Sequence, residues 1–257
     1  MKIVLIGAGK LAWHLGPALQ NAGAEIIEVY SRNLKNAKAL SSRVGALPFN
    51  EIGVLAKTAD LYLLAVADQA IPIVADQLKS KLGVEENIVH TSGATPGAAL
   101  NSFSRIYGVF YPLQSFSKEI AVDFTKVPIC VSANDVYLEG KLLGLAQKLS
   151  PIVYRLDDAQ RAQLHVAAVF ANNFINHLLG ISHDLLNEAG IPKNILQNII
   201  RTTVFKLESS HAKDLQTGPA VRRDWDTLKR HQALLADDPM ILEIYQKLSE
   251  HIIKTNT

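Results

Sequence analysis

The first dozen residues constrain the fold of this chain more than any other stretch. Lys2–Ile6 is a short apolar run with β-branched residues, as expected of one buried parallel strand. Residues 7–12 follow at once with the spacing G-x-G-x-x-A, and residues 13–20 form an amphipathic stretch. This order of strand, glycine turn and helix predicts a βαβ unit of the type that binds the pyrophosphate of a dinucleotide.

Each small residue in the turn has a mechanical reason. Gly7 lets the chain turn sharply after the strand. Gly9 lets a phosphate approach the backbone because it has no Cβ, and Ala12 lets the helix pack close to the sheet. The free N–H groups and the positive dipole end of the helix would then face the phosphates. A bare tight turn in another α/β protein is the alternative. The candidate cofactor-binding residues here are Gly7, Ala8, Gly9, Lys10 and Leu11.

Composition narrows the class of protein. At 257 residues, 48% hydrophobic and 19% charged, the chain is typical of a soluble globular enzyme. The formal net charge of +2 gives no reason to expect a nucleic-acid or membrane partner. Cys130 is the single cysteine, so no disulfide forms within the chain. No apolar run approaches the length of a bilayer span and no signal-peptide pattern is found, which together favour a cytoplasmic protein.

Strand and helix patterns alternate from residue 2 to residue 155. Short apolar runs predict strands and the stretches between them predict helices, one of which ends at Gly83. This rhythm predicts an α/β fold with a doubly wound, mostly parallel Rossmann sheet and right-handed crossovers. The predicted strands are residues 2–6, 24–30, 46–49, 61–66, 88–91, 106–111, 128–132 and 152–155.

The alternation stops near Asp157. Beyond it we find no strand pattern and predict four helices, the first covering residues 158–188. The other three begin with a proline, which removes no intrahelical hydrogen bond in a first turn: Pro192, Pro219 and Pro239. We therefore expect a dinucleotide-binding domain at residues 1–157 and an all-α domain for substrate binding and dimerisation at residues 158–257.

The predicted all-α domain is rich in apolar positions. Four helices beside a sheet domain do not bury all of them, and an uncovered apolar face marks an interface. We therefore predict a homodimer formed mainly by residues after Asp158. The N-terminus of the helix predicted at Pro219, with Arg222 close by, would suit an anionic substrate group, and an N-cap with exposed charges is the alternative. The apolar positions include Leu178, Leu179, Leu185, Leu186, Ile195, Ile199 and Ile200.

The end of the second predicted strand indicates which dinucleotide binds. An acidic residue usually stands there and binds the ribose hydroxyls. This chain has Ser31 and Arg32 instead. An arginine with a hydroxyl can bind a 2′-phosphate, whereas a carboxylate would repel it. We therefore expect NADP as the cofactor, with a solvated loop arginine as the alternative.

Two further strand ends lie at the same predicted edge of the sheet, where a nicotinamide ribose would bind. Val66, Ala67 and Asp68 leave the fourth strand, and Thr91 and Ser92 leave the fifth, so all five are candidate cofactor-binding residues. For Asp68, a cap of the following helix is the favoured role. For Ser92 and for His90 before it, turn chemistry and a structural hydrogen bond are the alternatives.

The first predicted helix of the second half carries a polar stripe. His165, Asn172, Asn176 and His183 repeat at seven, four and seven residues, which places them on one face of an α-helix, with Asn173 beside them. Residues 166–170 look buried, so the polar groups need partners. A substrate pocket would supply them, and structural hydrogen bonds at a helix or dimer interface are the alternative. The spacing and the lack of a carboxylate cluster argue against a metal site.

Several of these segments resemble known families. Residues 7–12, 29–32 and 65–68 resemble the NADP-binding half of the β-hydroxyacid dehydrogenase group, which includes pyrroline-5-carboxylate reductases, prephenate dehydrogenases and deazaflavin-dependent NADP reductases. The resemblance to one uncharacterised bacterial family, a Rossmann-like domain followed by a helical domain of unknown function, spans nearly the whole chain. It implies the fold and the cofactor better than the substrate. The segments similar to that family are residues 90–93, 111–116, 165–173 and 217–224.

Two positions depart from the pattern of that family. It usually has His-Pro where this chain has Tyr111-Pro112, and it tends to have glycine where this chain has Arg223. In prephenate dehydrogenases the corresponding histidine serves the substrate site, and that role is not carried over to Tyr111. A tyrosine can still donate a proton or a hydrogen bond, although it titrates far above neutral pH unless perturbed.

Together these features favour an NADP-dependent oxidoreductase that reduces a small-molecule carbonyl or imine substrate. His165 is the candidate general acid, because histidine titrates nearest to neutral pH. Asn173 would orient the substrate and Tyr111 would assist from the opposite wall. These three are the candidate catalytic residues, and no metal is expected. A dinucleotide-binding sensor or assembly protein without catalysis is the alternative.

Overall fold

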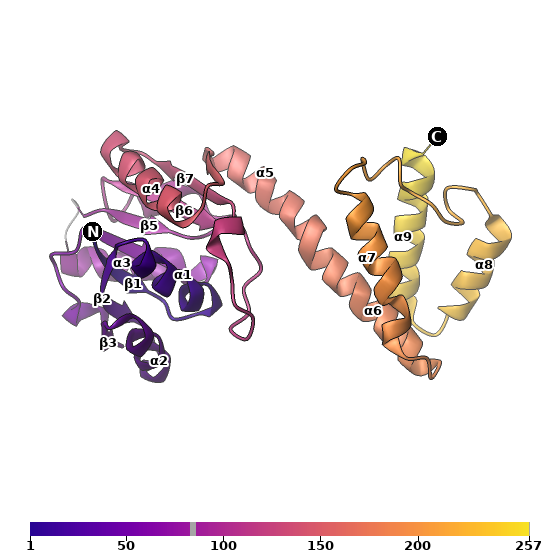
Figure 1. Ribbon diagram of the computed structural model, residues 1–257, viewed down its shortest axis with the longest axis horizontal. Coiled ribbons are helices and arrows are strands. Elements are labelled where there is room, and N and C mark those ends of the chain that lie inside the picture. The colour runs from indigo at the N-terminus through magenta and orange to yellow at the C-terminus, as the bar shows by residue number, and fades with distance from the viewer. Residues whose placement is uncertain (83–85, 257) are drawn as a thin grey trace. The chain divides into compact units, whose positions relative to one another are not determined.

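The computed structural model describes residues 1–82 and 86–256, so Gly83, the predicted helix end, lies outside the described residues (Figure 1). The chain divides into two compact units, Met1–Asn172 and Asn173–Thr257. The first unit holds one sheet of order β3-β2-β1-β4-β5-β6-β7-β8. Its strands are β1 Lys2–Ile6, β2 Glu25–Tyr30, β3 Leu47–Phe49, β4 Leu61–Leu64, β5 Ile88–His90, β6 Tyr107–Pro112, β7 Ile129–Ala133 and β8 Val153–Arg155.

Helices cover both faces of this sheet. On one face α1 (Lys10–Asn21), α2 (Leu34–Val44) and α4 (Val136–Leu149) bury their apolar residues, and on the other α3 (Ile71–Leu82) does so. Strand β1 serves both cores, because Ile3 and Leu5 face one while Val4 and Ile6 face the other. All four are 0% exposed. The structure confirms the predicted doubly wound, mostly parallel sheet followed by a helical region.

Two strands, β7 and β8, run against the other six. Strands β6 and β7 pair antiparallel, with Tyr111 opposite Cys130, whereas every other pair in the described sheet is parallel. The segment between them forms no α-helix, so it makes no crossover and β7 returns in the opposite direction. The chain therefore leaves β8 at the amino-terminal edge of β1–β6, and α5 (Asp158–Ala168) begins there.

A long helix, Asp158–Glu188, begins with α5 and ends with α6 (Ile175–Glu188). The predicted helix at residues 158–188 is therefore confirmed. The later helices are α7 (Gln197–Lys206), α8 (Trp225–Leu234) and α9 (Pro239–Thr255). Pro239 begins α9 as predicted, and Pro192 precedes a 3-10 turn rather than an α-helix.

The prediction of a helix beginning at Pro219 is wrong. Residues 219–223 form turns, and α8 begins at Trp225 with the Asp224 side chain as its cap. Arg223 has a φ of +54°, a left-handed conformation that cannot continue an α-helix. The helix N-terminus nearest to Arg222 is that of α8, which the Asp224 carboxylate already caps, so the predicted N-terminus at Pro219 does not exist to receive an anionic group.

A π-helical segment, Val169–Phe174, interrupts the long helix. Because a π-helix has a wider turn than an α-helix, the spacing of seven residues does not keep His165 and Asn172 on one face. The predicted single stripe is therefore wrong. The predicted burial of residues 166–170 is also wrong for the single chain, since the side chains of Val166 and Phe170 are 51% and 64% exposed.

The helix Asp158–Glu188 is long and apolar enough to cross a membrane by length and composition alone, which corrects the expectation that no such segment exists. Core helices of soluble proteins pass the same test. Asparagine and histidine side chains also interrupt its apolar run, so the helix is weak evidence for a membrane span.

Candidate functional site

The turn after β1 forms a cradle that requires glycine at its first position. Gly7 has a φ of +114°, and a Cβ there would lie 2.1 Å from the carbonyl oxygen of Ala65. At Gly9 a Cβ would meet no atom within 4 Å, so the space above this residue is open. Helix α1 begins at the next residue without a side-chain cap. Its first N–H groups are therefore left for an anion.

A cavity of about 450 Å³ extends from this cradle along the carboxyl ends of β1, β2 and β4. Ser31 and Arg32 line it at the end of β2. The Arg32 side chain is exposed and forms no ion pair within the described part of the chain, so its guanidinium is available to an anion. The cavity thus combines an open glycine cradle with a free cation, which is what a dinucleotide with a 2′-phosphate requires.

Seven of the twelve predicted cofactor-binding residues line this cavity: Gly7, Ala8, Gly9, Ser31, Arg32, Val66 and Ala67. Lys10 and Leu11 lie in the first turn of α1, beside the cradle but outside the lining. Asp68 begins a 3-10 turn, Asp68–Ala70, and the cap position of that turn belongs to Ala67. The turn has no side-chain capping bond, so the predicted capping role of Asp68 is wrong.

Helix α3 and the turn before it form a wall of the cavity that was not predicted from the sequence. Ala70, Ile73, Val74 and Gln77 line the cavity at the spacing of one helix face. Ile73 is 63% exposed, an apolar side chain left uncovered beside the cavity. The helical period counted onward from β4 is the signal that could have found this wall.

The hydroxyl groups of the loop after β5 form hydrogen bonds within the protein. The Thr91 hydroxyl donates to the Leu64 carbonyl oxygen, and the Ser92 hydroxyl accepts from the N–H groups of Ala94 and Thr95. Both hydroxyls are buried and lie outside the cavity lining, so cofactor binding by Thr91 and Ser92 stays a prediction.

His90 makes structural hydrogen bonds, which was the alternative role given for it from the sequence. Its Nδ1 accepts from the Ser92 N–H at 3.2 Å, so Nε2 carries the proton that reaches the Pro96 carbonyl oxygen at 3.3 Å. The ring is 0% exposed. Burial lowers the pKa of His90 to about 4, so the ring is neutral at pH 7.

Tyr111 and His165 meet at the carboxyl edge of the sheet. The Tyr111 hydroxyl lies 3.1 Å from His165 Nδ1, and the two rings meet edge to face. Both side chains are half-buried and stand against Gly93, where a Cβ would lie 2.6 Å from His165 Nδ1. Only glycine therefore allows this close approach. The structure brings together two of the three predicted catalytic residues.

Burial raises the pKa of the Tyr111 hydroxyl to about 12. Nearby Cys130 and Asp68 add to that rise, while Arg161 opposes it. The hydroxyl therefore keeps its proton at neutral pH and can donate it to a neutral His165 ring. Asn173, the third predicted catalytic residue, lies in the π-helical segment and in the second unit, and its role stays a prediction.

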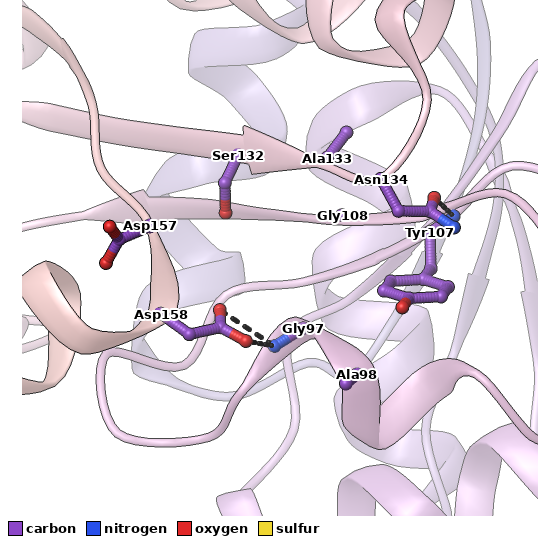
Figure 2. A pocket seen from close by; sticks show the side chains of 9 residues that line it. All are labelled: Gly97, Ala98, Tyr107, Gly108, Ser132, Ala133, Asn134, Asp157 and Asp158. Carbon is purple, nitrogen blue, oxygen red and sulfur yellow. Dashed lines mark hydrogen bonds between the residues drawn. The ribbon is translucent and has the colours of Figure 1, made fainter.

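A second cavity of about 370 Å³ lies at the start of α5. Figure 2 shows Asp158, Gly97 and Tyr107 around it, away from the carboxyl ends of the parallel strands. Among the described residues no group of three His, Cys, Asp or Glu side chains is placed to hold a metal ion.

Two family models match the chain. Residues 2–92 match the family described as NADP oxidoreductase coenzyme F420-dependent, and residues 127–252 match a domain of unknown function, DUF2520. No curated protein sequence matches the chain.

Solved structures match nearly the whole chain. A "putative NADP oxidoreductase" from Bacteroides fragilis is 36% identical with a TM-score of 0.92, and the match covers 98% of each chain. The pyrroline-5-carboxylate reductase of Streptococcus pyogenes is 15% identical with a TM-score of 0.62, covering 99% of this chain and 98% of that one. An imine reductase from Myxococcus stipitatus is 14% identical with a TM-score of 0.60, covering 99% and 94%. The last two show the fold alone.

Proposed function

The chain belongs to the family of the Bacteroides fragilis protein, and in this chain the match to the NADP oxidoreductase coenzyme F420-dependent family precedes the match to DUF2520. From this premise we propose that it is an NADP-dependent reductase of a small carbonyl or imine substrate. The observation that carries the proposal is the Tyr111–His165 pair. It stands at the same edge of the sheet as the glycine cradle. In open α/β sheets, ligands bind at that edge.

The residues of the cavity fit NADP. The backbone at Gly9 and the first N–H groups of α1 would hold the pyrophosphate, because a Cβ is absent where the phosphates must approach. Ser31 and Arg32 would hold the 2′-phosphate, since both line the cavity and Arg32 has no other charged partner in the described part of the chain. When bound, the cofactor supplies the hydride.

The Tyr111–His165 pair would supply the proton. With His165 neutral, the Tyr111 hydroxyl donates to Nδ1 and leaves the ring proton on Nε2. With His165 protonated, Nδ1 donates to the hydroxyl instead. In either state the pair can pass a proton to a carbonyl oxygen or an imine nitrogen as negative charge develops there. Asn173 is the proposed orienting residue, because an amide can bind such a group but cannot protonate it.

The test measures oxidation of NADPH with a panel of cyclic imines, ketones and aldehydes. We expect turnover with one of these classes, and we expect His165→Ala and Tyr111→Phe to lower turnover while NADPH affinity is kept. Tyr107→Phe is the matched control, because Tyr107 lies at the other end of β6 and lines the second cavity. NADPH binding without oxidation by any substrate class would favour a non-catalytic sensor or assembly protein instead.

A homodimer is part of the same proposal. Large apolar side chains after Asp158 are exposed in the single chain, among them Ile195, Ile199, Val204 and Phe205 at 60–70%. Such a surface normally marks an interface. A cytoplasmic location also belongs to the proposal, supported by the single cysteine, Cys130, which is buried and reduced.

A further inference from the structure

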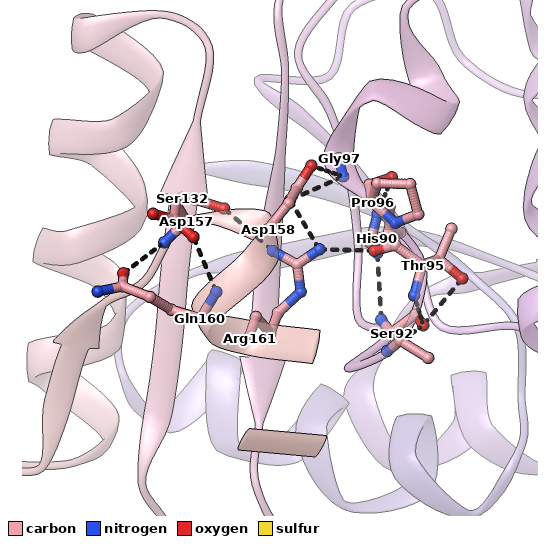
Figure 3. A network of polar contacts seen from close by, with 11 residues as sticks. His90, Ser92, Thr95, Pro96, Gly97, Ser132, Asp157, Asp158, Gln160 and Arg161 are labelled. Carbon is pink, nitrogen blue, oxygen red and sulfur yellow. Dashed lines mark hydrogen bonds and ion pairs between the residues drawn. The ribbon is translucent and has the colours of Figure 1, made fainter. Parts of the chain in front are cut away.

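One fully buried side chain of α5 is an arginine that the proposed chemistry does not use. Arg161 is 1% exposed. Its Nη2 donates to the Thr95 carbonyl oxygen at 2.6 Å and lies 2.8 Å from Asp158 Oδ1, and its Nη1 lies 3.4 Å from Ser132 Oγ (Figure 3). Its Nε has no hydrogen-bond partner among the described residues. A buried charge is costly even when it is paired, and apolar residues can often replace it. The charge at this position therefore calls for a reason beyond packing.

The partners of this guanidinium come from separate parts of the first unit. Thr95 belongs to the loop between β5 and β6, Ser132 to β7, and Asp158 to the first turn of α5. The Asp158 carboxylate also accepts from the Gly97 N–H, with both oxygens at 3.0 Å (Figure 2). A guanidinium is planar and its donors point in fixed directions. These contacts therefore fix both the rotation and the height of α5 against the loop after β5.

His165 lies one helical turn beyond this anchor. It follows Arg161 by four residues, so both side chains are on the same face of α5. The His165 ring rests on Gly93, which belongs to the loop that Arg161 holds through Thr95. The loop bound by the Arg161 guanidinium therefore also packs against the His165 ring, which bonds to Tyr111.

We propose that Arg161 is a positioning residue, whose guanidinium locks α5 onto the loop after β5 so that His165 stays within hydrogen-bond distance of Tyr111. This inference rests on the proposed function of the Tyr111–His165 pair. The His165 ring has little room to move, because it lies between Gly93 on one side and the Tyr111 hydroxyl on the other. A shift of about 1 Å in α5 would break the bond, and misplacement of that size costs roughly 100-fold in rate.

The charge of Arg161 also acts on the pair. Burial raises the pKa of the Tyr111 hydroxyl, and the positive guanidinium opposes that rise. An apolar residue at this position would remove both the clamp and the charge. A lysine would keep the charge and lose the planar set of donors. The two effects are therefore separable by substitution.

The test compares Arg161→Met with Arg161→Lys. Gln163→Met is the matched control, because Gln163 is exposed on the same helix two residues away. Tyr111→Phe supplies the reference for a broken pair, and His165→Ala identifies the His165 signals. The decisive readout is the NMR spectrum of the His165 ring nitrogens, which report the bond to Tyr111 and which a merely structural role of Arg161 would leave unchanged.

We expect Arg161→Met and Arg161→Lys to give the His165 spectrum of Tyr111→Phe, while Gln163→Met gives that of the wild type. Calorimetric affinity for NADPH should be unchanged, because the glycine cradle makes no contact with Arg161. With a substrate class that supports turnover, kcat should fall roughly 10- to 100-fold and KM should change little.

An unchanged His165 spectrum in folded Arg161→Met would overturn the proposal. If Arg161→Met does not fold, Arg161→Lys decides by the same spectrum. Failure of both variants to fold would make Arg161 a requirement of the fold and would also overturn the positioning role. The proposed function fails separately, through full turnover in His165→Ala and Tyr111→Phe, whatever Arg161 does to the ring signals.

Discussion

Stability of the first unit should fall as the pH drops from 7 to 5, because His90 is buried in its neutral form. The folded pKa of His90 is about 4, lowered mainly by burial, and the unfolded value is 6.5. Between these two values the unfolded chain binds a proton that the folded chain does not bind. Lowering the pH therefore favours unfolding, and the stabilisation that is fully present above pH 6.5 is lost as the pH approaches 4.

The two pKa values set the size of the effect. Linkage between 6.5 and about 4 gives a loss of about 2 kcal/mol from pH 7 to pH 5. Asp158 does not contribute in this range, because its folded pKa is lowered below 3.8 and its stabilisation is lost only in stronger acid. Over the range from pH 5 to pH 7, the difference between the wild type and a His90 variant therefore reports His90.

The assay is urea unfolding at pH 7 and pH 5 with and without His90→Asn. An asparagine oxygen can still accept from the Ser92 N–H but does not titrate. Both proteins should carry Trp225→Phe, so that Trp13 alone reports the first unit. The wild type should lose about 2 kcal/mol more than His90→Asn over this interval. Equal losses in the two proteins would refute the assignment of His90 as a buried neutral ring.

Four further results are expected. Arg32→Ala should weaken NADP binding roughly 10- to 100-fold in calorimetry and leave NAD binding unchanged, and equal wild-type affinities for both would contradict this. Gly93→Ala should lower turnover by a similar factor because its Cβ displaces His165, whereas Gly53→Ala, which meets no atom within 4 Å, should not. Arg223→Gly should stabilise the second unit by about 1 kcal/mol in denaturation experiments, because its φ is +54°. Light scattering should give a dimer at micromolar concentration, and a monomer would refute the proposed interface.

Much of the sheet could be predicted from the sequence. Each predicted strand overlaps an observed strand, and the ends differ by at most two residues. The apolar runs are short and are bounded by glycine or polar residues, so the strand pattern has little ambiguity. The direction of β7 could not be predicted from the strand pattern. A run such as 129–133 carries no sign of its partner's direction, and only the missing crossover helix between β6 and β7 hints at it.

The site could be predicted only in part. The glycine turn and Arg32 follow a local pattern whose chemistry is readable, and both line the cavity. The π-helical segment Val169–Phe174 has no signature in a 3.6-residue period, so the polar stripe was misjudged. Arg161 gave no signal, because an arginine in an amphipathic helix is usually solvated and only tertiary contacts show that this one is buried.

The antiparallel β7 limits which insertions and deletions the chain can tolerate. Because the chain leaves β8 at the amino-terminal edge of β1–β6, the first two turns of α5 span the distance back to the carboxyl edge and place His165 beside Tyr111. Removing one residue between Arg161 and His165 would turn the histidine by about 100° and withdraw it by about 1.5 Å while the anchor stays in place. Substitutions at exposed positions such as Gln163 leave the spacing between Arg161 and His165 unchanged, so the segment can vary in composition but not in length.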